Sequence, residues 1–243
     1  MTKLRKIRIT SEILDTFPAV MIGVVRAHKI NNQGAQPKLQ AELRQATELA
    51  LQAVGSNPPS RHPRIACWRE AYRSFGVKPK KYHSSIENLV RRVAKSGPPR
   101  SINKLVDLYN VVSLTHLMPV GGEDLDQIEG DLVLRYATES DSAALLLGES
   151  EPRRATPGEV IYCDSVGPVC RRWNWKEADR TKLTEETTSA VLVIEALPPV
   201  TRPDLEKALT HLTDLIARYC EGETRISILD AENPALQLPA QGT

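Results

Sequence analysis

The hydrophobic periodicity of this chain changes at Pro119, and the change limits the folds that the chain can adopt. Before Pro119, four segments repeat apolar residues at the three-to-four spacing of amphipathic helices, at residues 38–55, 63–76, 84–97 and 101–113. After Pro119, short β-branched or alternating runs are separated by Gly, Pro and Asp, at residues 131–139, 159–165, 189–197 and 225–229. The pattern predicts one α+β domain over residues 1–230, with a β-rich, barrel-like core and several packed helices.

Other segments fit the same plan. Residues 7–9 and 19–28 read as strands, and a long amphipathic helix follows Pro203. Gly55 is placed to end the helix before it, and Ser84 with Glu87 has the spacing of a capping box. Leu39, Leu43, Ala46, Ala50 and Ala53 share one helix face, and Ile102, Leu105, Val106 and Tyr109 share another. Residues 231–243 lack periodicity, so we expect a loose tail.

Several classes of protein are excluded by what the sequence lacks. It has no glycine-rich phosphate-binding motif, no zinc-protease motif and no Gly-x-Ser-x-Gly nucleophile motif. Its four cysteines and five histidines are scattered without ligand spacing, which predicts reduced thiols, no metal site and no cofactor. No apolar run is long enough to cross a membrane and no leader pattern opens the chain, which predicts a cytoplasmic protein. His116 is the most suggestive histidine, although a lone histidine is usually structural.

Positive charge is concentrated in one segment. Residues 61–104 contain twelve Lys and Arg against two Glu, a net charge of +10, although the whole chain carries only +2. Such a segment either binds phosphates or solvates the outer faces of helices. Under the first reading, the candidate RNA-binding residues here are Lys80, Lys81, Arg91 and Arg92.

Polar residues inside apolar patterns mark a candidate ligand site. Asn103, Asp107 and Asn110 recur at helical spacing, and short amide and carboxylate side chains suit tight hydrogen bonds. Glu195 interrupts an apolar strand that should be buried on both faces, so its carboxylate needs a partner or a raised pKa. We predict that these four residues converge on one cavity, with the alternative that Glu195 caps a strand or pairs with an arginine.

The stretch Arg171–Lys182 groups two tryptophans with basic side chains. Trp173 and Trp175 could line a pocket or stack on a base, with Arg171, Arg172 and Lys176 near phosphate. Alternatively, a tryptophan anchors the loop in the core while the charges face water. We favour one structural tryptophan and one at the site.

Three stretches together resemble a known family: residues 101–114 followed by Pro119, residues 124–137, and residues 182–197. They look like the B3/B4 editing domain of the phenylalanyl-tRNA synthetase β subunit, and the chain as a whole looks like a free-standing B3/B4 protein. The resemblance implies an editing-type fold and hydrolysis of misacylated tRNA. It also implies that Glu195 occupies the position of the glutamate that recognises the tyrosine hydroxyl.

One position departs from the family pattern. The family has a histidine two residues after the proline, where this chain has Gly121. The resemblance therefore does not carry over the tyrosine specificity or the arrangement that positions water. An aminoacyl ester is labile, however, so a site can act by placing water and a ribose hydroxyl near the carbonyl. Gly121 and Gly122 could bring backbone amides close to such a substrate.

Three functions stay open at the level of sequence. The first is hydrolysis of a mischarged aminoacyl-tRNA ester, with the aminoacylated 3′ end of tRNA as the partner. The second is a non-catalytic tRNA-binding module, which the missing histidine favours. The third is a protein or enzyme that binds free amino acids or their derivatives, against which the basic segment counts.

Overall fold

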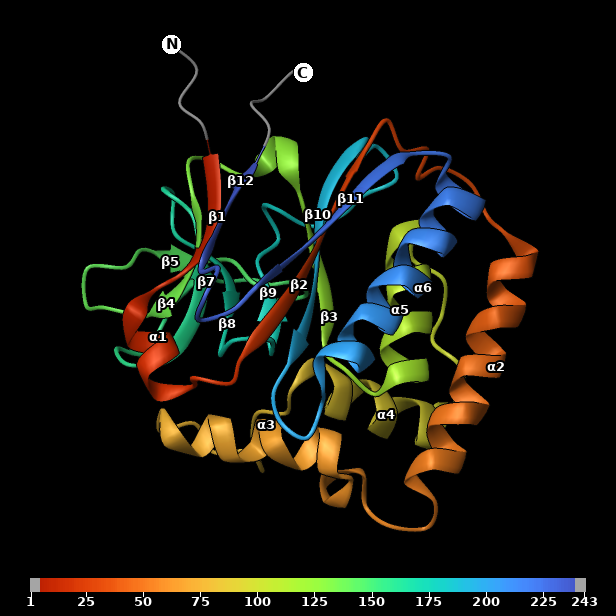
Figure 1. Ribbon diagram of the computed structural model, residues 1–243, viewed down its shortest axis with the longest axis horizontal. Coiled ribbons are helices and arrows are strands. Elements are labelled where there is room, and N and C mark those ends of the chain that lie inside the picture. Colours follow the sequence, from red (N-terminus) through yellow and green to blue (C-terminus); the bar gives the residue numbers. More distant parts are fainter. Residues whose placement is uncertain (1–4, 239–243) are drawn as a thin grey trace.

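The computed structural model of the protein describes residues 5–238 and has the predicted α+β fold. Two open sheets form the β-rich core, and the three longest helices gather on one side of them (Figure 1). Within the described residues neither sheet closes into a barrel.

The six-stranded sheet has the order β12-β1-β4-β7-β8-β9. Its strands are Arg5–Ile9 (β1), Leu132–Tyr136 (β4), Val160–Cys163 (β7), Pro168–Arg171 (β8), Lys176–Glu177 (β9) and Ala235–Leu238 (β12). Only β1 and β4 pair in parallel; the other neighbours are antiparallel. A separate hairpin joins Ala143–Ala144 (β5) to Arg153–Arg154 (β6).

The four-stranded sheet has the order β11-β2-β10-β3 and is antiparallel throughout. Its strands are Met21–His28 (β2), Val120–Asp124 (β3), Ser189–Ala196 (β10) and Glu223–Leu229 (β11). In the register of β3 on β10, Gly121 lies opposite Val193 and Glu123 opposite Val191. Because side chains alternate along a strand, these four residues and Glu195 share one face of the sheet.

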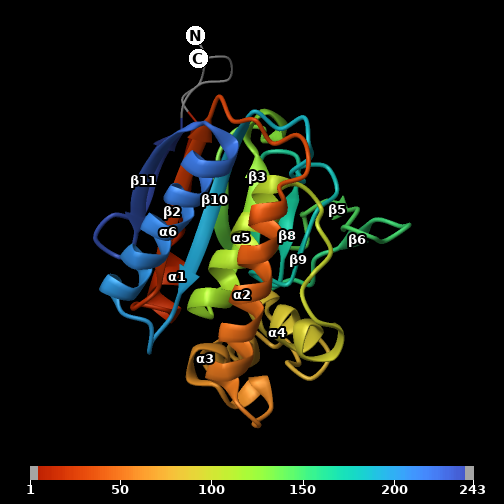
Figure 2. The same cartoon turned by 90° about the vertical axis from the view of Figure 1, so that its right-hand side faces the viewer.

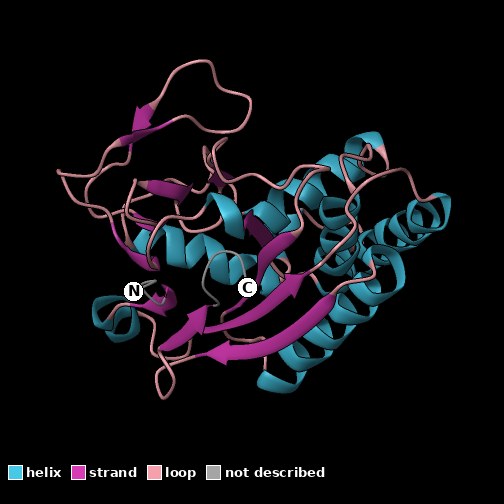
Figure 3. Ribbon diagram, turned by 90° about the horizontal axis from the view of Figure 1, so that it is seen from above, coloured by secondary structure: helices cyan, strands magenta, loops and turns pink. Residues whose placement is uncertain are grey.

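Helices cover the four-stranded sheet and one end of the molecule. They are Ser11–Thr16 (α1), Pro37–Val54 (α2), Pro63–Ser74 (α3), Ser85–Ser96 (α4), Lys104–His116 (α5) and Arg202–Cys220 (α6), with short 3-10 turns at Pro59–Arg61 and Leu125–Gln127. α5 and α6 pack against the sheet, and α2 packs on α5 on the side away from the strands (Figure 1 and Figure 2). In Figure 3, seen from above, the small strands and long loops lie on the opposite side. One continuous apolar core joins the helices to both sheets.

Local signals placed most helix ends correctly. Gly55 ends α2 with a φ of 63°, which a glycine adopts without strain. The Ser84 hydroxyl accepts a hydrogen bond from the amide of Glu87 at the start of α4. The predicted inner face of α5 was wrong at Ile102, which is 64% exposed, because the helix begins only at Lys104.

The expected tail is partly ordered. Residues 235–238 form β12, which pairs with β1 at the other end of the described chain, and Leu238 is buried. Backbone pairing with a distant strand leaves no periodic signal in so short a segment, which is why the sequence did not show it. Residues 239–243 lie outside the described part. Among the described residues, no helix is long and apolar enough to span a membrane.

Candidate functional site

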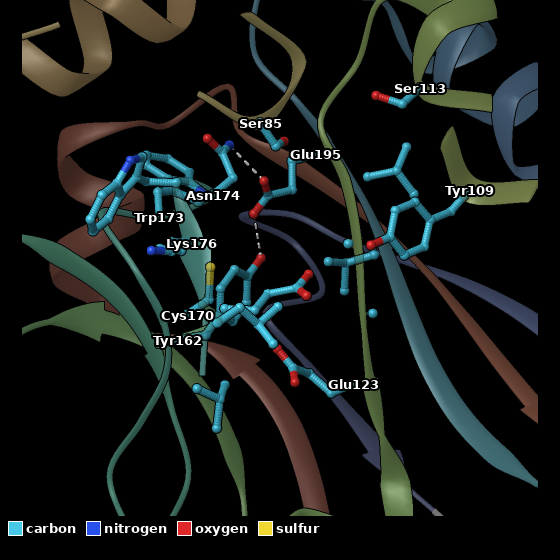
Figure 4. A pocket seen from close by; sticks show the side chains of 18 of the residues that line it. Ser85, Tyr109, Ser113, Glu123, Tyr162, Cys170, Trp173, Asn174, Lys176 and Glu195 are labelled. Atoms are coloured by element: carbon cyan, nitrogen blue, oxygen red, sulfur yellow. Dashed lines mark hydrogen bonds between the residues drawn. The ribbon is translucent and has the colours of Figure 1, made fainter. Parts of the chain in front are cut away.

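A cavity of about 400 Å³ lies between the two sheets, beneath the first turns of α4 and the middle of α5. Its walls come from β3, β7, β8, β10 and the turn between β8 and β9 (Figure 4). Glu195, Asn110, Gly121, Gly122, Trp173 and Trp175 all line this cavity, although they are widely separated in sequence.

Glu195 lies at the inner end of the cavity and is only 2% exposed. Tyr162 donates its hydroxyl to Oε1 and Asn174 donates its amide to Oε2, both at 2.7 Å (Figure 4). Tyr72 in turn donates to the amide oxygen of Asn174 at 2.9 Å, which fixes that side chain. Burial raises the pKa of Glu195 to about 7, and the hydrogen bonds from Asn174 and Tyr162 oppose that rise. The Glu195 carboxylate is therefore a positioned acceptor, and no cation among residues 5–238 forms an ion pair with it.

Two further carboxylates face the same cavity. Glu123 lies two residues beyond Gly121 on β3, and Glu177 comes from β9. A Cβ atom at Gly121 would lie 2.9 Å from Oε1 of Glu177, so the absence of a side chain there leaves room for this carboxylate. We call Glu123 and Glu177 the acid pair.

Burial and mutual repulsion make it unfavourable for both carboxyl groups of the acid pair to be ionised together. Burial raises the pKa of Glu177 to about 7, opposed by a hydrogen bond from the backbone amide of Gly122. Burial, followed by the charge of Glu177, raises the pKa of Glu123 well above its ordinary value. The glycine pair thus lies beside a protein carboxylate, whereas we expected it to present amides to a substrate.

The outer rim of the cavity is basic and aromatic. Arg92 is exposed at the rim, and Lys176 pairs with Glu149 at 3.0 Å. The guanidinium of Arg172 lies over the rings of both Tyr82 and Trp175, 3.8 and 4.4 Å from their centroids, and the two rings meet edge-on with centroids 5.0 Å apart. This cluster holds Trp175 at the rim, where a base or ribose could contact it.

Trp173 anchors the turn between β8 and β9. Its side chain is fully buried and packs edge-on against Phe17 and Trp68, with centroids 4.9 and 5.2 Å away. Its φ of 65° is rare for a bulky residue, and the packing holds it there. Trp173 therefore supports the fold, although it also lines the cavity, and Trp175 lies at the rim.

The structure does not bring Asn103 and Asp107 to the cavity. Asn103 caps α5 by accepting a hydrogen bond from the amide of Val106 at 3.0 Å. Asp107 accepts hydrogen bonds from Gln40 and from the amide of Ile102, at 2.8 and 3.1 Å, and so fixes the chain before α5. Both side chains bond to backbone amides at the start of α5, as helix N-termini require, and each also bonds to a distant segment, Asn103 to the carbonyl of Leu183 and Asp107 to Gln40. His116 lies elsewhere, 3.1 Å from His211.

Some of the predicted RNA-binding residues are exposed, and others are paired within the fold. Lys80, Lys81 and Arg92 are exposed. Arg171 is 3% exposed and its guanidinium binds both oxygens of Glu159, at 2.7 and 2.9 Å, so it is a buried structural residue here and not a free phosphate ligand. Arg172 is held against the rings of Tyr82 and Trp175, and Arg91 pairs with Glu87 at 2.9 Å. Sequence could not show these partners because Glu159 and Tyr82 are distant along the chain.

Among the cavity residues that were missed from the sequence are Glu123, Glu177, Tyr162, Asn174 and Cys170. The sequence gives a weak signal for Glu123 and Glu177, since each is a carboxylate directly after a predicted site residue, Gly122 or Lys176. The Cys170 thiol is the most nucleophilic group among them. Burial and the neighbouring carboxylates raise its pKa well above the ordinary value, so it stays protonated at neutral pH.

Sequence comparisons find regions of known proteins that are similar to this chain. The B3/4 domain family matches residues 67–221. The phenylalanine–tRNA ligase beta subunit of Protochlamydia amoebophila is 28% identical over 181 residues, which cover 73% of this chain and 22% of that protein. The same subunit from Cutibacterium acnes is 31% identical over 110 residues, covering 45% of this chain and 13% of that protein. The chain thus spans less than a quarter of these curated relatives.

A solved structure is similar over most of the chain. It is an N-terminal fragment of the phenylalanyl-tRNA synthetase β subunit from Pyrococcus horikoshii, with a TM-score of 0.49 and 11% sequence identity. The match covers 96% of this chain and 54% of the fragment.

Proposed function

The chain belongs to the B3/4 domain family, and from this membership we propose that it binds tRNA and hydrolyses the ester of a mischarged aminoacyl-tRNA. The observation that carries the proposal is the cavity, whose rim is basic and aromatic and whose inner end holds the fixed acceptor Glu195. A charged tRNA has the matching polarity, because its phosphates and terminal base precede the aminoacyl group.

The reaction requires no covalent intermediate. Water attacks the carbonyl carbon, the bond from that carbon to the ribose oxygen breaks, and the products are the free amino acid and the tRNA with a free terminal hydroxyl. The protonated Cys170 thiol does not favour attack by a protein nucleophile. The chain's contribution is to hold the aminoacyl group by its side chain and to keep the ester beside water and the ribose hydroxyl.

One observation favours a non-catalytic tRNA-binding module instead. Gly121 supplies no side chain to position water, and the carboxylate above it belongs to Glu177. In that case the cavity would hold the aminoacyl group without releasing it.

Release of amino acid from a panel of separately charged tRNAs tests the proposal. We expect at least one charged tRNA to be deacylated about tenfold or more faster than it decays alone. Binding without release from any member would favour the non-catalytic module. Neither binding nor release would leave a small-molecule function for the cavity and overturn the tRNA proposal.

A further inference from the structure

The acid pair is not explained by the fold. Glu123 is only 7% exposed, and its Oε2 atom makes no hydrogen bond of normal length with the described residues, although the buried hydroxyl of Thr181, itself unpaired, lies near enough to lower the pKa of Glu123. Its carboxyl group points into the cavity in Figure 4. A buried carboxylate oxygen left unpaired costs free energy, so its retention at the wall of a cavity points to a partner that arrives with a ligand.

The missing partner is not a protein cation. Lys176 is paired with Glu149 at 3.0 Å, and Arg180 is paired with Asp164 at 2.8 Å. Arg92 lies at the exposed rim. Within the described residues, no ion pair reaches Glu123, Glu177 or Glu195, and no group of side chains has the arrangement of a metal site.

The cavity is therefore graded in charge, with cations at the mouth and three carboxylates inside. A ligand whose phosphate end stays at the rim presents its far end to the acid pair. Two neighbouring carboxylates repel each other unless a proton or a cation lies between them, so a cation brought by the ligand can replace the proton that the free pair retains.

We propose that the acid pair binds an ammonium group at the end of the ligand's side chain, so that the aminoacyl group accepted here is a cationic one of the lysyl type. This inference rests on the proposed function for the identity of the ligand. It does not depend on hydrolysis, because a ligand with an amide in place of the ester reports binding alone.

The probes are 3′-aminoacylamino-3′-deoxyadenosines, in which an amide replaces the labile ester. The lysyl, norleucyl and tyrosyl analogues share the adenosine and the α-amino group, and the norleucyl chain differs from lysyl by the absence of the terminal ammonium. Titration calorimetry with the full chain should show the lysyl analogue binding at least tenfold more tightly than either of the others. Equal affinities, tighter tyrosyl binding, or no binding of the lysyl analogue at millimolar concentration would overturn the proposal.

Variants locate the effect in the cavity. Glu123→Gln and Glu177→Gln each keep the side-chain volume, and each should weaken lysyl binding about tenfold or more while leaving norleucyl binding unchanged. Glu139→Gln makes the same change in net charge at an exposed position away from the cavity and should alter neither. If lysyl affinity survives in both cavity variants, the acid pair is not the site. The comparison of analogues on the unaltered protein stands even if a variant fails to fold.

Proton release gives a second readout. The titratable or charged groups around the acid pair are Tyr109, Tyr162, Asp164, Cys170, Arg180 and Glu195. Because Glu177 has a pKa of about 7 and that of Glu123 is higher, the free pair retains protons that a bound cation displaces. Lysyl affinity should therefore rise from pH 6 to pH 8, with proton uptake by the buffer seen in calorimetry. A flat profile for the lysyl analogue would contradict a cation on the pair.

Discussion

The buried carboxylate of Glu195 accepts two fixed hydrogen bonds. Its role in recognising a ligand can therefore be tested separately from its role in stabilising the fold. Tyr162 and Asn174 each donate to one of its oxygens, and Tyr72 holds Asn174. A site built around a buried acceptor discriminates strongly, since a ligand lacking the matching donor leaves that acceptor poorly satisfied. The residue therefore tests whether the cavity reads the ligand's side chain.

Replacing Glu195 by Gln keeps the volume and removes the charge. We expect a changed order of preference among charged tRNAs, together with a flatter dependence of stability on pH. The folded pKa of about 7 lies above the unfolded value, so the folded state keeps a proton that the unfolded state loses. In the unaltered protein, the unfolding free energy contributed by Glu195 should therefore fall by up to about 3 kcal/mol as the pH rises from about 4.5 to 7, and the variant should lack this fall.

Two measurements on the same preparation check this prediction: deacylation rates across the panel, and denaturant unfolding at several pH values. Unchanged preference with a clear loss of stability would show that Glu195 only holds strands together. An equally steep fall in stability with pH in the variant would assign the titration to other groups.

The adjacent glycines of β3 offer a matched pair of substitutions. At Gly121 a Cβ would meet only Oε1 of Glu177, the end of a flexible side chain, at 2.9 Å. At Gly122 it would lie 2.5 Å from Cδ2 of Leu192, inside the core. Gly122→Ala should therefore cost about 1–3 kcal/mol in unfolding free energy, and Gly121→Ala less than about 1 kcal/mol while it weakens ligand binding. Urea unfolding with analogue titration measures both, and the reverse order of stabilities would contradict the packing described here.

At the scale of elements, α4 has two functions on neighbouring residues. Arg91 pairs with Glu87, a carboxylate with no exposed surface that also binds Arg69 at 2.8 Å. Arg92, one position along, is exposed at the mouth of the cavity. The helix thus anchors itself through one arginine and presents the other to a ligand.

Alanine substitutions should separate these roles. Arg91→Ala should lower the unfolding free energy by about 1 kcal/mol or less, since Arg69 remains to pair with Glu87. Arg92→Ala should leave stability unchanged and weaken binding of every tRNA alike, because a phosphate contact carries no sequence information. Filter binding and thermal melts of the two variants make the comparison, and loss of affinity in Arg91→Ala alone would contradict it.

At the scale of the whole molecule, the basic segment keeps much of its charge available. Five of its twelve cations are paired or buried within the fold, among them Arg64, Arg69 and Lys104. The other seven are exposed and make no ion pair with the described residues: Arg61, Lys78, Lys80, Lys81, Arg92, Lys95 and Arg100. They lie on and around α3 and α4, and Arg92 among them lines the cavity.

Affinity for tRNA should consequently fall steeply with salt. Each phosphate that is neutralised releases counterions, so the logarithm of the binding constant should decrease linearly with the logarithm of salt concentration. If several of the seven exposed cations take part, affinity should drop by about an order of magnitude or more between 50 and 200 mM salt. Binding that does not change with salt would remove the basic segment from the interface.

The sequence by itself determined where most helices and strands lie in the chain, and it identified one residue of the site, Glu195. The positions of α2 to α6 and of the strands that bear Tyr162 and Glu195 followed from periodicity and caps, since both are encoded within a few residues of each other. Glu195 could be singled out because a carboxylate conflicts with an apolar strand on any fold.

Only the tertiary structure decided which polar residues share a cavity. The acid pair forms because β3 and β9, in different sheets, bring Glu123 and Glu177 to the same wall, and Gly121 leaves room for the second carboxylate. Arg171 is withdrawn from solvent by Glu159, and β12 is ordered by β1. These contacts join residues far apart in the chain, so the free energy that fixes them depends on long-range packing and pairing that local patterns do not encode.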